Sequence, residues 1–224
     1  MKKIKKGLIT VLLGSALIVM GCSSLNKTQK GAAVGTASGA AVGAIAGKTA
    51  GNTALGAILG AAVGGTAGVI IGQQMDKQAE EIKANVPEAE VIRVQEGIMV
   101  ELNNNILFGF DQSALSNDAK ANLDKLVKVL NNYQDTDIEI QGHTDNTGSQ
   151  EYNQNLSEER ATRVSTYLNS KGINRNRLST IGFGEMLPKY LNNSNDGREK
   201  NRRVEFLITA NDDMKARAEN QAKQ

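Results

Sequence analysis

The chain has 224 residues, of which 40% are hydrophobic and 22% charged, and its formal net charge at pH 7 is +2. Four lysines lie within the first six residues; without them the 26 basic residues fall to 22 against 24 acidic ones, which argues against nucleic acid as the main partner. The single cysteine excludes a disulfide within the chain and a metal site built from several thiolates.

The composition divides the chain into two unlike halves. Most of the 23 glycines lie before residue 97, whereas all four phenylalanines lie after it. Only the second half therefore has aromatic side chains for a packed core, and the first half needs a different explanation.

Residues 1–21 have the pattern of a secretory signal peptide. The lysine-rich start is followed by an apolar run from Leu8 to Met20 and then by Gly21-Cys22. The sequence Val19-Met20-Gly21-Cys22 resembles the lipobox of bacterial lipoproteins, and this resemblance implies a diacylglyceryl thioether on Cys22 and acylation of its new amine. The alternative is an ordinary signal peptide with a chance cysteine.

A lipidated N-terminus at residues 22–30 would be a stable anchor, because several acyl chains hold a protein where one chain is marginal. In the lipoproteins that this segment resembles, an aspartate after the cysteine favours retention in the inner membrane. Here the position is Ser23. The resemblance therefore implies an outer-membrane location, with the following domain in the periplasm.

Glycine recurs every fourth residue from 31 to 51 and again from 56 to 72. This spacing places the glycines on one helix face, where two backbones can approach closely. Two uncharged segments of about 17–20 residues flank Lys48, and each is roughly 25–30 Å long as a helix, close to the hydrocarbon thickness of a bilayer. We predict a membrane-associated helical hairpin over 31–72, resembling glycine-zipper segments of small envelope lipoproteins.

Two alternatives remain open for residues 31–72. Glycine costs about 1 kcal/mol per residue in a helix, so the segment could be a flexible linker or a water-soluble element that self-associates. Self-association within the membrane, giving a homo-oligomer, stays equally open. Residues 73–90 are charged and helix-favouring up to Pro87, which predicts a spacer helix.

The remaining pattern alternates strands and helices over residues 91–210. Residues 91–94 and 98–102 alternate apolar and polar side chains around Gly97, which predicts a β-hairpin. Ser116 can cap a helix that ends near residue 132, and Ser149 can cap a second helix that ends at Lys171-Gly172. Short strands are expected around 138–140, 178–183 and 204–208.

This order predicts an α+β fold, a βαβαββ sandwich with helices on one face of a mixed sheet. The last segment, 211–224, lacks an apolar face, which predicts a frayed tail. Arg163 is expected on the helix surface, and Arg202 and Arg203 on opposite faces of the last strand.

Motifs within this domain closely resemble the peptidoglycan-binding domain of the OmpA family. They are the run GHTDNTG at 142–148, Tyr152-Asn153, Leu156-Ser157, Arg160-Ala161, Gly182-Phe183-Gly184-Glu185 and Asn201-Arg202-Arg203-Val204-Glu205, with Phe108, Phe110 and Asp111 fitting the family's start. The resemblance implies the fold predicted above and a non-catalytic domain that takes peptidoglycan as its partner.

The resemblance also implies a site for the diaminopimelate residue of peptidoglycan stem peptides. Asp145 would accept from the ligand's ammonium, and Arg160 would bind its carboxylate through two hydrogen bonds. Asn153 and Thr147 are expected to complete the polar wall, with Asp111 as a neighbour. Two alternatives are a purely structural salt bridge between Asp145 and Arg160, and a pair that opens to admit the ligand.

An enzyme is not expected. With one histidine and an acylated cysteine, neither Cys/His nor zinc chemistry is available, and His143 is expected to be structural. We therefore predict no metal and no cofactor, and an outer-membrane lipoprotein that tethers the membrane to the cell wall. The alternative is an oligomeric membrane element or envelope assembly factor driven by residues 31–72, with wall binding ancillary.

Overall fold

The computed structural model describes residues 65–94, 97–108 and 112–223. The signal peptide, Cys22 and residues 31–64 of the predicted hairpin lie outside the described residues, as does Asp111. Within the described ranges, no helix combines the length and the apolar character that a membrane span requires.

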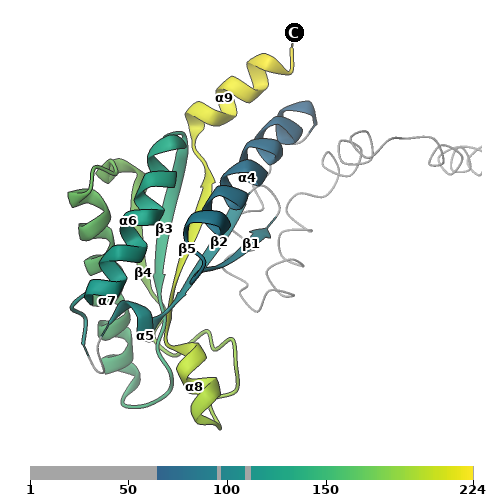
Figure 1. The fold of residues 1–224 in the computed structure, drawn as a ribbon. Helices are drawn as coiled ribbons and strands as arrows, with labels where there is room; N and C mark the ends of the chain where they lie inside the picture. The colour runs from purple at the N-terminus through teal and green to yellow at the C-terminus, as the bar shows by residue number, and fades with distance from the viewer. Residues whose placement is uncertain (1–64, 95–96, 109–111, 224) are drawn as a thin grey trace, which may run out of the picture.

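Five strands form one mixed sheet with helices packed on it (Figure 1). The strand order is β1-β2-β5-β3-β4; β3 and β4 are parallel, and the other neighbours are antiparallel. The α+β prediction is confirmed. In chain order the elements are α4 (Thr66–Asn85), β1 (Glu90–Val94), β2 (Gly97–Asn103), α5 (Asn104–Leu107), α6 (Asn117–Asn132), β3 (Thr136–Gly142), α7 (Gln150–Ser170), a 3-10 turn (Arg175–Arg177), β4 (Leu178–Gly182), α8 (Asn195–Asn201), β5 (Arg203–Ala210) and α9 (Asp212–Gln221).

The predicted hairpin corresponds to β1 and β2, with Val91 opposite Val100. Alternation along β2 divides its side chains between two faces: Val100 and Leu102 are fully buried in the main core, while Glu101 points to the other face. Helices α4, α6 and α7 cover the core face, which places the core between the sheet and one helical layer.

The two predicted helix caps are present. The Ser116 hydroxyl accepts a hydrogen bond from the Ala119 N–H at 2.9 Å, and the Ser149 hydroxyl accepts from the Tyr152 N–H at 3.2 Å. Helix α7 ends before Gly172, whose φ of 98° suits glycine. These local signals explain why both helix boundaries were predictable from the sequence.

Helix α4 corrects the prediction of a spacer at 73–90. It begins at Thr66, inside the segment assigned to the glycine hairpin, and its inner face is buried in the domain core. The buried positions Ile71, Met75, Ala79 and Ile82 follow a spacing of four, four and three residues, as an amphipathic helix requires. Each large apolar side chain buried in this way contributes about 1.5–3 kcal/mol, so α4 is part of the domain.

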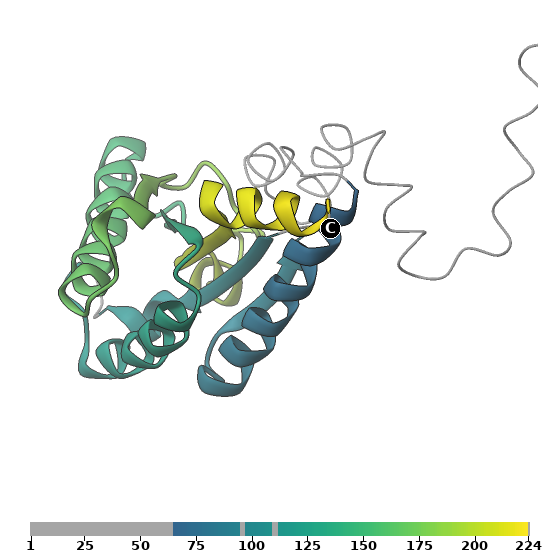
Figure 2. The same cartoon turned by 90° about the horizontal axis from the view of Figure 1, so that it is seen from above.

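The predicted frayed tail at 211–224 is also wrong, because residues 212–221 form helix α9. The Asn211 side chain caps it by accepting from the Met214 N–H at 3.0 Å. Met214 and Ala218, one turn apart, are buried against α4. Figure 2 shows α9 (yellow) ending beside α4 (blue). Two apolar positions among charged neighbours are too weak a pattern to predict a helix from the sequence. Helix α9 is stabilised by its contact with α4.

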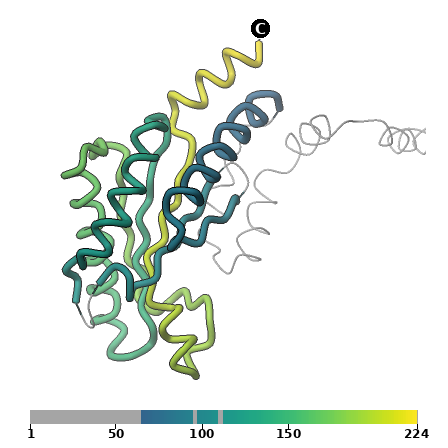
Figure 3. Tube along the Cα trace, viewed as in Figure 1, coloured from purple at the N-terminus to yellow at the C-terminus, as the bar shows by residue number. Residues whose placement is uncertain are grey.

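The two ends of the sheet carry different elements. The C-terminal ends of β2, β3 and β4 and the N-terminal end of β5 meet at one end of the sheet, together with α5 and α8. At the other end β5 leads into α9, which contacts the first turns of α4 through Ile70 and Ile71. The tube in Figure 3 follows this arrangement. The chain therefore enters the domain at the end opposite α5 and α8.

Two paired glycines allow α7 to approach the sheet closely. Gly142 of β3 lies opposite Gly182 of β4. A Cβ atom on Gly142 would lie 2.1 Å from the Ser157 carbonyl oxygen, and one on Gly182 would lie 2.4 Å from the Glu158 Cγ. Side chains at these positions would push α7 outward. The glycines thus set the position of α7 relative to the loop that follows β3.

Candidate functional site

A cleft of about 630 Å³ opens at the end of the sheet where α5 and α8 lie. The loop after β3, the first turns of α7, α5 and the end of α8 all contribute to its wall. Its lining residues are Asn104, Asn105, Phe108, Thr144, Asp145, Thr147, Gly148, Tyr152, Asn153, Leu156, Arg160, Arg198 and Arg202. The structure therefore brings together four of the five predicted ligand-binding residues, and the fifth, Asp111, lies outside the described residues.

Asp145 is held in place by two donors. Its Oδ1 accepts from the Thr147 N–H at 2.8 Å, and its Oδ2 lies 2.5 Å from a guanidinium nitrogen of Arg202. Burial raises the pKa of the Asp145 carboxyl, but the Thr147 N–H and the Arg202 guanidinium outweigh burial, so the net pKa is lowered. Asp145 is therefore a carboxylate at neutral pH, with lone pairs left for a further donor.

Arg160 enters the cleft from α7 with its side chain almost fully buried. Its Nε donates to the Gln112 carbonyl at 3.1 Å, and its guanidinium lies 5.3 Å from the centre of the Phe108 ring. Both contacts fix the plane of the guanidinium. Asn153, Leu156 and Arg160 share one face of α7 and all line the cleft.

The remaining predicted residues occupy the cleft wall in different ways. Asn153 is buried, and its side-chain amide donates to the Glu185 carboxylate at 2.6 Å. Thr147 is exposed and fixes Asp145 through its backbone. The side chain of Asn153 is thus held in place in the cleft wall, whereas Thr147 contributes through its backbone N–H, which holds Asp145 in position.

Arg202 is a cleft residue that the sequence analysis missed. It ends α8 and reaches across 57 positions of sequence to form the ion pair with Asp145. The predicted alternative, in which Asp145 pairs with Arg160, is thereby replaced by an Asp145–Arg202 pair. The motif Asn201-Arg202-Arg203 offered a signal, since two adjacent arginines at the start of a strand must face opposite ways.

His143 and Arg203 belong to a separate buried cluster. Arg203 Nε lies 2.7 Å from a Glu205 carboxylate oxygen, and the His143 ring stacks on Phe183 with 5.3 Å between ring centres. Burial, with the nearby Arg203 charge, holds the pKa of His143 well below its usual value of 6.5. The ring is therefore neutral at physiological pH. In the part of the chain that the structure describes, no group of three or more His, Cys, Asp or Glu side chains is placed to hold a metal.

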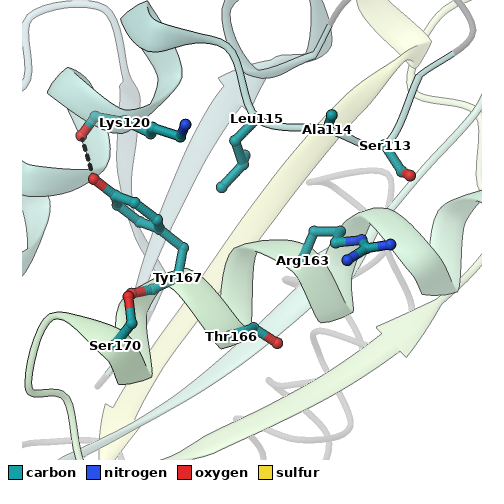
Figure 4. A pocket seen from close by; sticks show the side chains of 8 residues that line it. All are labelled: Ser113, Ala114, Leu115, Lys120, Arg163, Thr166, Tyr167 and Ser170. Atoms are coloured by element: carbon teal, nitrogen blue, oxygen red, sulfur yellow. Dashed lines mark hydrogen bonds between the residues drawn. The ribbon is translucent and has the colours of Figure 1, made fainter.

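A second hollow, of about 450 Å³, lies between the N-terminal end of α6 and the second half of α7 (Figure 4). Its lining includes Lys120, Arg163 and Tyr167. The Tyr167 hydroxyl is already engaged with the Asp124 carboxylate at 2.9 Å, and Arg163 is an exposed surface charge paired with Glu159, as expected. Among the described residues that line this hollow there is no carboxylate, so they lack the opposite charges that the cleft combines.

The fold and the cleft define a domain of the OmpA type. Residues 107–202 match the model of the OmpA family, and residues 1–76 match that of the YMGG-like Gly-zipper. The chain thus carries a segment that matches the glycine-zipper model and, C-terminal to it, a segment that matches the OmpA family. Helices α4 and α9 pack on this domain from outside residues 107–202, and the first half of α4 lies within the residues that match the Gly-zipper model.

Two relatives and one solved structure illustrate this likeness. A photosystem I P700 chlorophyll a apoprotein A2 from Gloeobacter violaceus is 42% identical over 136 residues, which are 58% of this chain and 16% of that protein. A peptidoglycan-associated lipoprotein from Buchnera aphidicola is 34% identical over 100 residues, 45% of this chain and 58% of that protein. The type VI secretion cell wall anchor from Pseudomonas aeruginosa aligns with a TM-score of 0.53 and 25% identity, over 61% of this chain and 96% of that one.

The chain spans less than two thirds of the length of both curated relatives. For the photosystem protein the shared part is a small segment, so its name describes a much longer chain.

Proposed function

We propose that the protein is a non-catalytic envelope lipoprotein that tethers the outer membrane to the cell wall. The observation that carries this proposal is the cleft in which Asp145 and Arg160 line one cavity of an OmpA-family domain. A relative named a peptidoglycan-associated lipoprotein and a structure titled a cell wall anchor support it.

The ligand in this proposal is the free end of the diaminopimelate side chain. Asp145 accepts from its ammonium, and Arg160 donates to its carboxylate; charge-assisted bonds of this kind contribute about 1.5–3 kcal/mol each. The Asp145–Arg202 pair keeps the carboxylate ionised and in position before the ligand arrives. A wall with lysine at this position lacks the carboxylate and would leave Arg160 without its ligand.

The geometry of the domain suits a tether. The chain enters at the start of α4, next to α9, while the cleft lies at the other end of the sheet. Strand β5, eight residues and about 26 Å long, runs between these two ends. An anchor that pulls on the start of α4 would therefore load the domain from the end opposite the cleft.

Co-sedimentation with isolated peptidoglycan tests this proposal. The full chain in detergent is mixed with diaminopimelate-type walls and centrifuged, together with the Asp145→Ala and Arg160→Ala variants and the control Arg163→Ala, all shown to be folded by circular dichroism. The unmodified chain and the control should pellet, while the two cleft variants stay in the supernatant. A wild-type chain that stays soluble, or cleft variants that pellet normally, would contradict the proposal.

A second candidate function rests on the match of residues 1–76 to the Gly-zipper model. In that case the zipper is the main element, forming a membrane oligomer or assisting envelope assembly, and wall binding is ancillary. Cross-linking of the full chain in membranes distinguishes the two: replacement of alternate zipper glycines by leucine should abolish oligomers without reducing wall binding.

A further inference from the structure

The cleft carries more positive charge than the end of one diaminopimelate side chain can use. Among its described lining residues are three arginines, at 160, 198 and 202, and one acid, Asp145. Arg202 already compensates Asp145. A ligand group with one ammonium and one carboxylate adds no net charge, so the described lining residues keep a positive charge after it binds.

Arg198 carries that remaining charge. Its guanidinium donates to the Asn192 carbonyl at 2.8 Å and to the Asn195 side-chain oxygen, and both acceptors are uncharged. The acids on the same helix are engaged elsewhere: Asp196 pairs with Lys200 at 2.9 Å, and Glu199 accepts from Asn105. Within the described residues, no carboxylate forms an ion pair with Arg198.

The position of Arg198 is fixed before any ligand binds. Its neighbour Gly197 packs so closely on the preceding loop that a Cβ there would lie 2.0 Å from the Leu191 carbonyl oxygen. The Ser194 hydroxyl caps α8 by accepting from the Gly197 N–H at 3.1 Å. With one acceptor on that loop and the other on the first residue of α8, the guanidinium is held at the cleft wall, which lowers the entropic cost of binding an anion.

Arg198 and Arg202 lie one helical turn apart, a spacing at which like charges repel. Asp145 relieves this repulsion for Arg202 only. An anion bound at Arg198 would compensate the charge of Arg198 and so reduce the remaining repulsion between the two arginines. A carboxylate suits this position because it fits the planar fork of a guanidinium.

We propose that Arg198 binds a second carboxylate of the same ligand, the α-carboxylate of a diaminopimelate residue that ends its stem peptide. This inference rests on the proposed function and adds a specificity to it. Stem peptides that end at diaminopimelate carry this carboxylate free, whereas in longer stems it is consumed in a peptide bond. The cleft would therefore prefer trimmed stems.

Calorimetric titration of the full chain in detergent tests this preference. The two probes are the synthetic tripeptide L-Ala-γ-D-Glu-diaminopimelate with a free terminal carboxylate and the same tripeptide with that carboxylate amidated. The wild-type chain should bind the acid about tenfold more tightly than the amide, the effect of one charge-assisted bond. Arg198→Gln should lose about tenfold for the acid and stay within twofold for the amide, and the control Arg163→Gln should change neither.

The comparison of the two probes separates binding from structure. If Arg198→Gln merely loosened the loop, it would weaken acid and amide equally, and the inference would be wrong. Equal affinity of the wild-type chain for both probes would overturn it as well, while leaving the proposed function intact. If the wild-type chain bound neither probe, the proposed function itself would fall.

Discussion

Two clusters of charged side chains in this domain contain similar residues but serve different purposes. In the cleft, Asp145, Arg160 and Arg202 line an open space of about 630 Å³. On the sheet face away from the helices, Lys189 lies 2.8 Å from Glu101, and Arg203 lies 2.7 Å from Glu205. We call the second group, Glu101, Lys189, Arg203 and Glu205, the sheet-face network.

The difference lies in what the charges face. In the sheet-face network, charges are matched within the chain, and Lys189 ties the loop before α8 to strand β2. Among the described lining residues of the cleft, three arginines stand against one carboxylate and surround a cavity. The charges paired in the sheet-face network are therefore structural, whereas Arg198 in the cleft wall, which forms no ion pair with a described carboxylate, is available for binding.

Breaking the sheet-face network should have the largest effect. Arg203 is almost fully buried between Glu205 and Glu101, so Arg203→Met would leave buried acids uncompensated. We expect the free energy of unfolding to fall by about 3–5 kcal/mol, measured by urea denaturation. The double variant Arg203→Met/Glu205→Leu should recover part of that loss. Near-normal stability of the single variant would show that the network is not structural.

Removing a cleft charge should instead act on binding. Arg160→Gln should reduce the affinity for a diaminopimelate tripeptide by about ten- to a hundredfold, since it removes a charge-assisted bond. Its unfolding free energy should fall less than that of Arg203→Met. Parallel calorimetric titration and urea denaturation measure both quantities. A variant that unfolds easily yet binds normally when folded would reverse the roles assigned to the two clusters.

Acidification should distinguish the clusters by the direction of their pKa shifts. Burial raises the pKa of Glu101 above its usual 4.5 despite Lys189 and Arg203, whereas the donors around Asp145 lower its pKa below the usual 3.8. The stability due to Asp145 is thus present above pH 3.8 and lost as the pH falls through its folded pKa. That due to Glu101 is present below pH 4.5 and lost as the pH rises through its folded pKa.

The thermal midpoints of Asp145→Asn and Glu101→Gln, measured against pH and compared with wild type, check this opposition. Asp145→Asn should destabilise the chain at neutral pH and converge with wild type in strong acid. The thermal midpoint of Glu101→Gln should rise relative to that of wild type as the pH rises above 4.5. If the difference in thermal midpoint from wild type changed with pH in the same direction for both variants, the opposite pKa shifts assigned to Asp145 and Glu101 would be wrong.

The smallest effect is expected at Arg163, beside the second hollow. Its pair with Glu159 is solvent-exposed, and exposed pairs contribute little to stability because water screens them. Arg163→Gln should leave the unfolding free energy nearly unchanged and leave wall binding unchanged in co-sedimentation. A clear loss of wall binding would instead make the hollow between α6 and α7 part of the binding surface.

Much of the fold followed from local signals in the sequence. The hairpin, the caps at Ser116 and Ser149 and the stop at Gly172 each depend on residues a few positions apart. The core of the site was predictable for a similar reason. Asp145 sits in a recognisable loop motif, and Arg160 lies seven residues after Asn153 on the same helix face.

What could not be predicted depends on contacts between distant segments. Arg202 meets Asp145 only because β5 lies beside β3 in the sheet, and the sequence pattern says nothing about that pairing. Helix α9 buries only Met214 and Ala218, and it is stabilised by packing on α4, whereas α4 buries five apolar side chains but begins inside the glycine repeat, which hides its start. The lipidated cysteine and the glycine hairpin remain predictions outside the described residues.

The packing of α4 on the domain has a mechanical consequence. A force between a membrane anchor and a ligand in the cleft enters through the first turn of α4 and leaves at the far end of the sheet. Such a load pulls α4 along the core, so that the buried contacts of Ile71, Met75 and Ile82 resist together and do not peel off one by one. In the proposed tether, the helix that completes the core would therefore also carry the load between the anchor and the cleft.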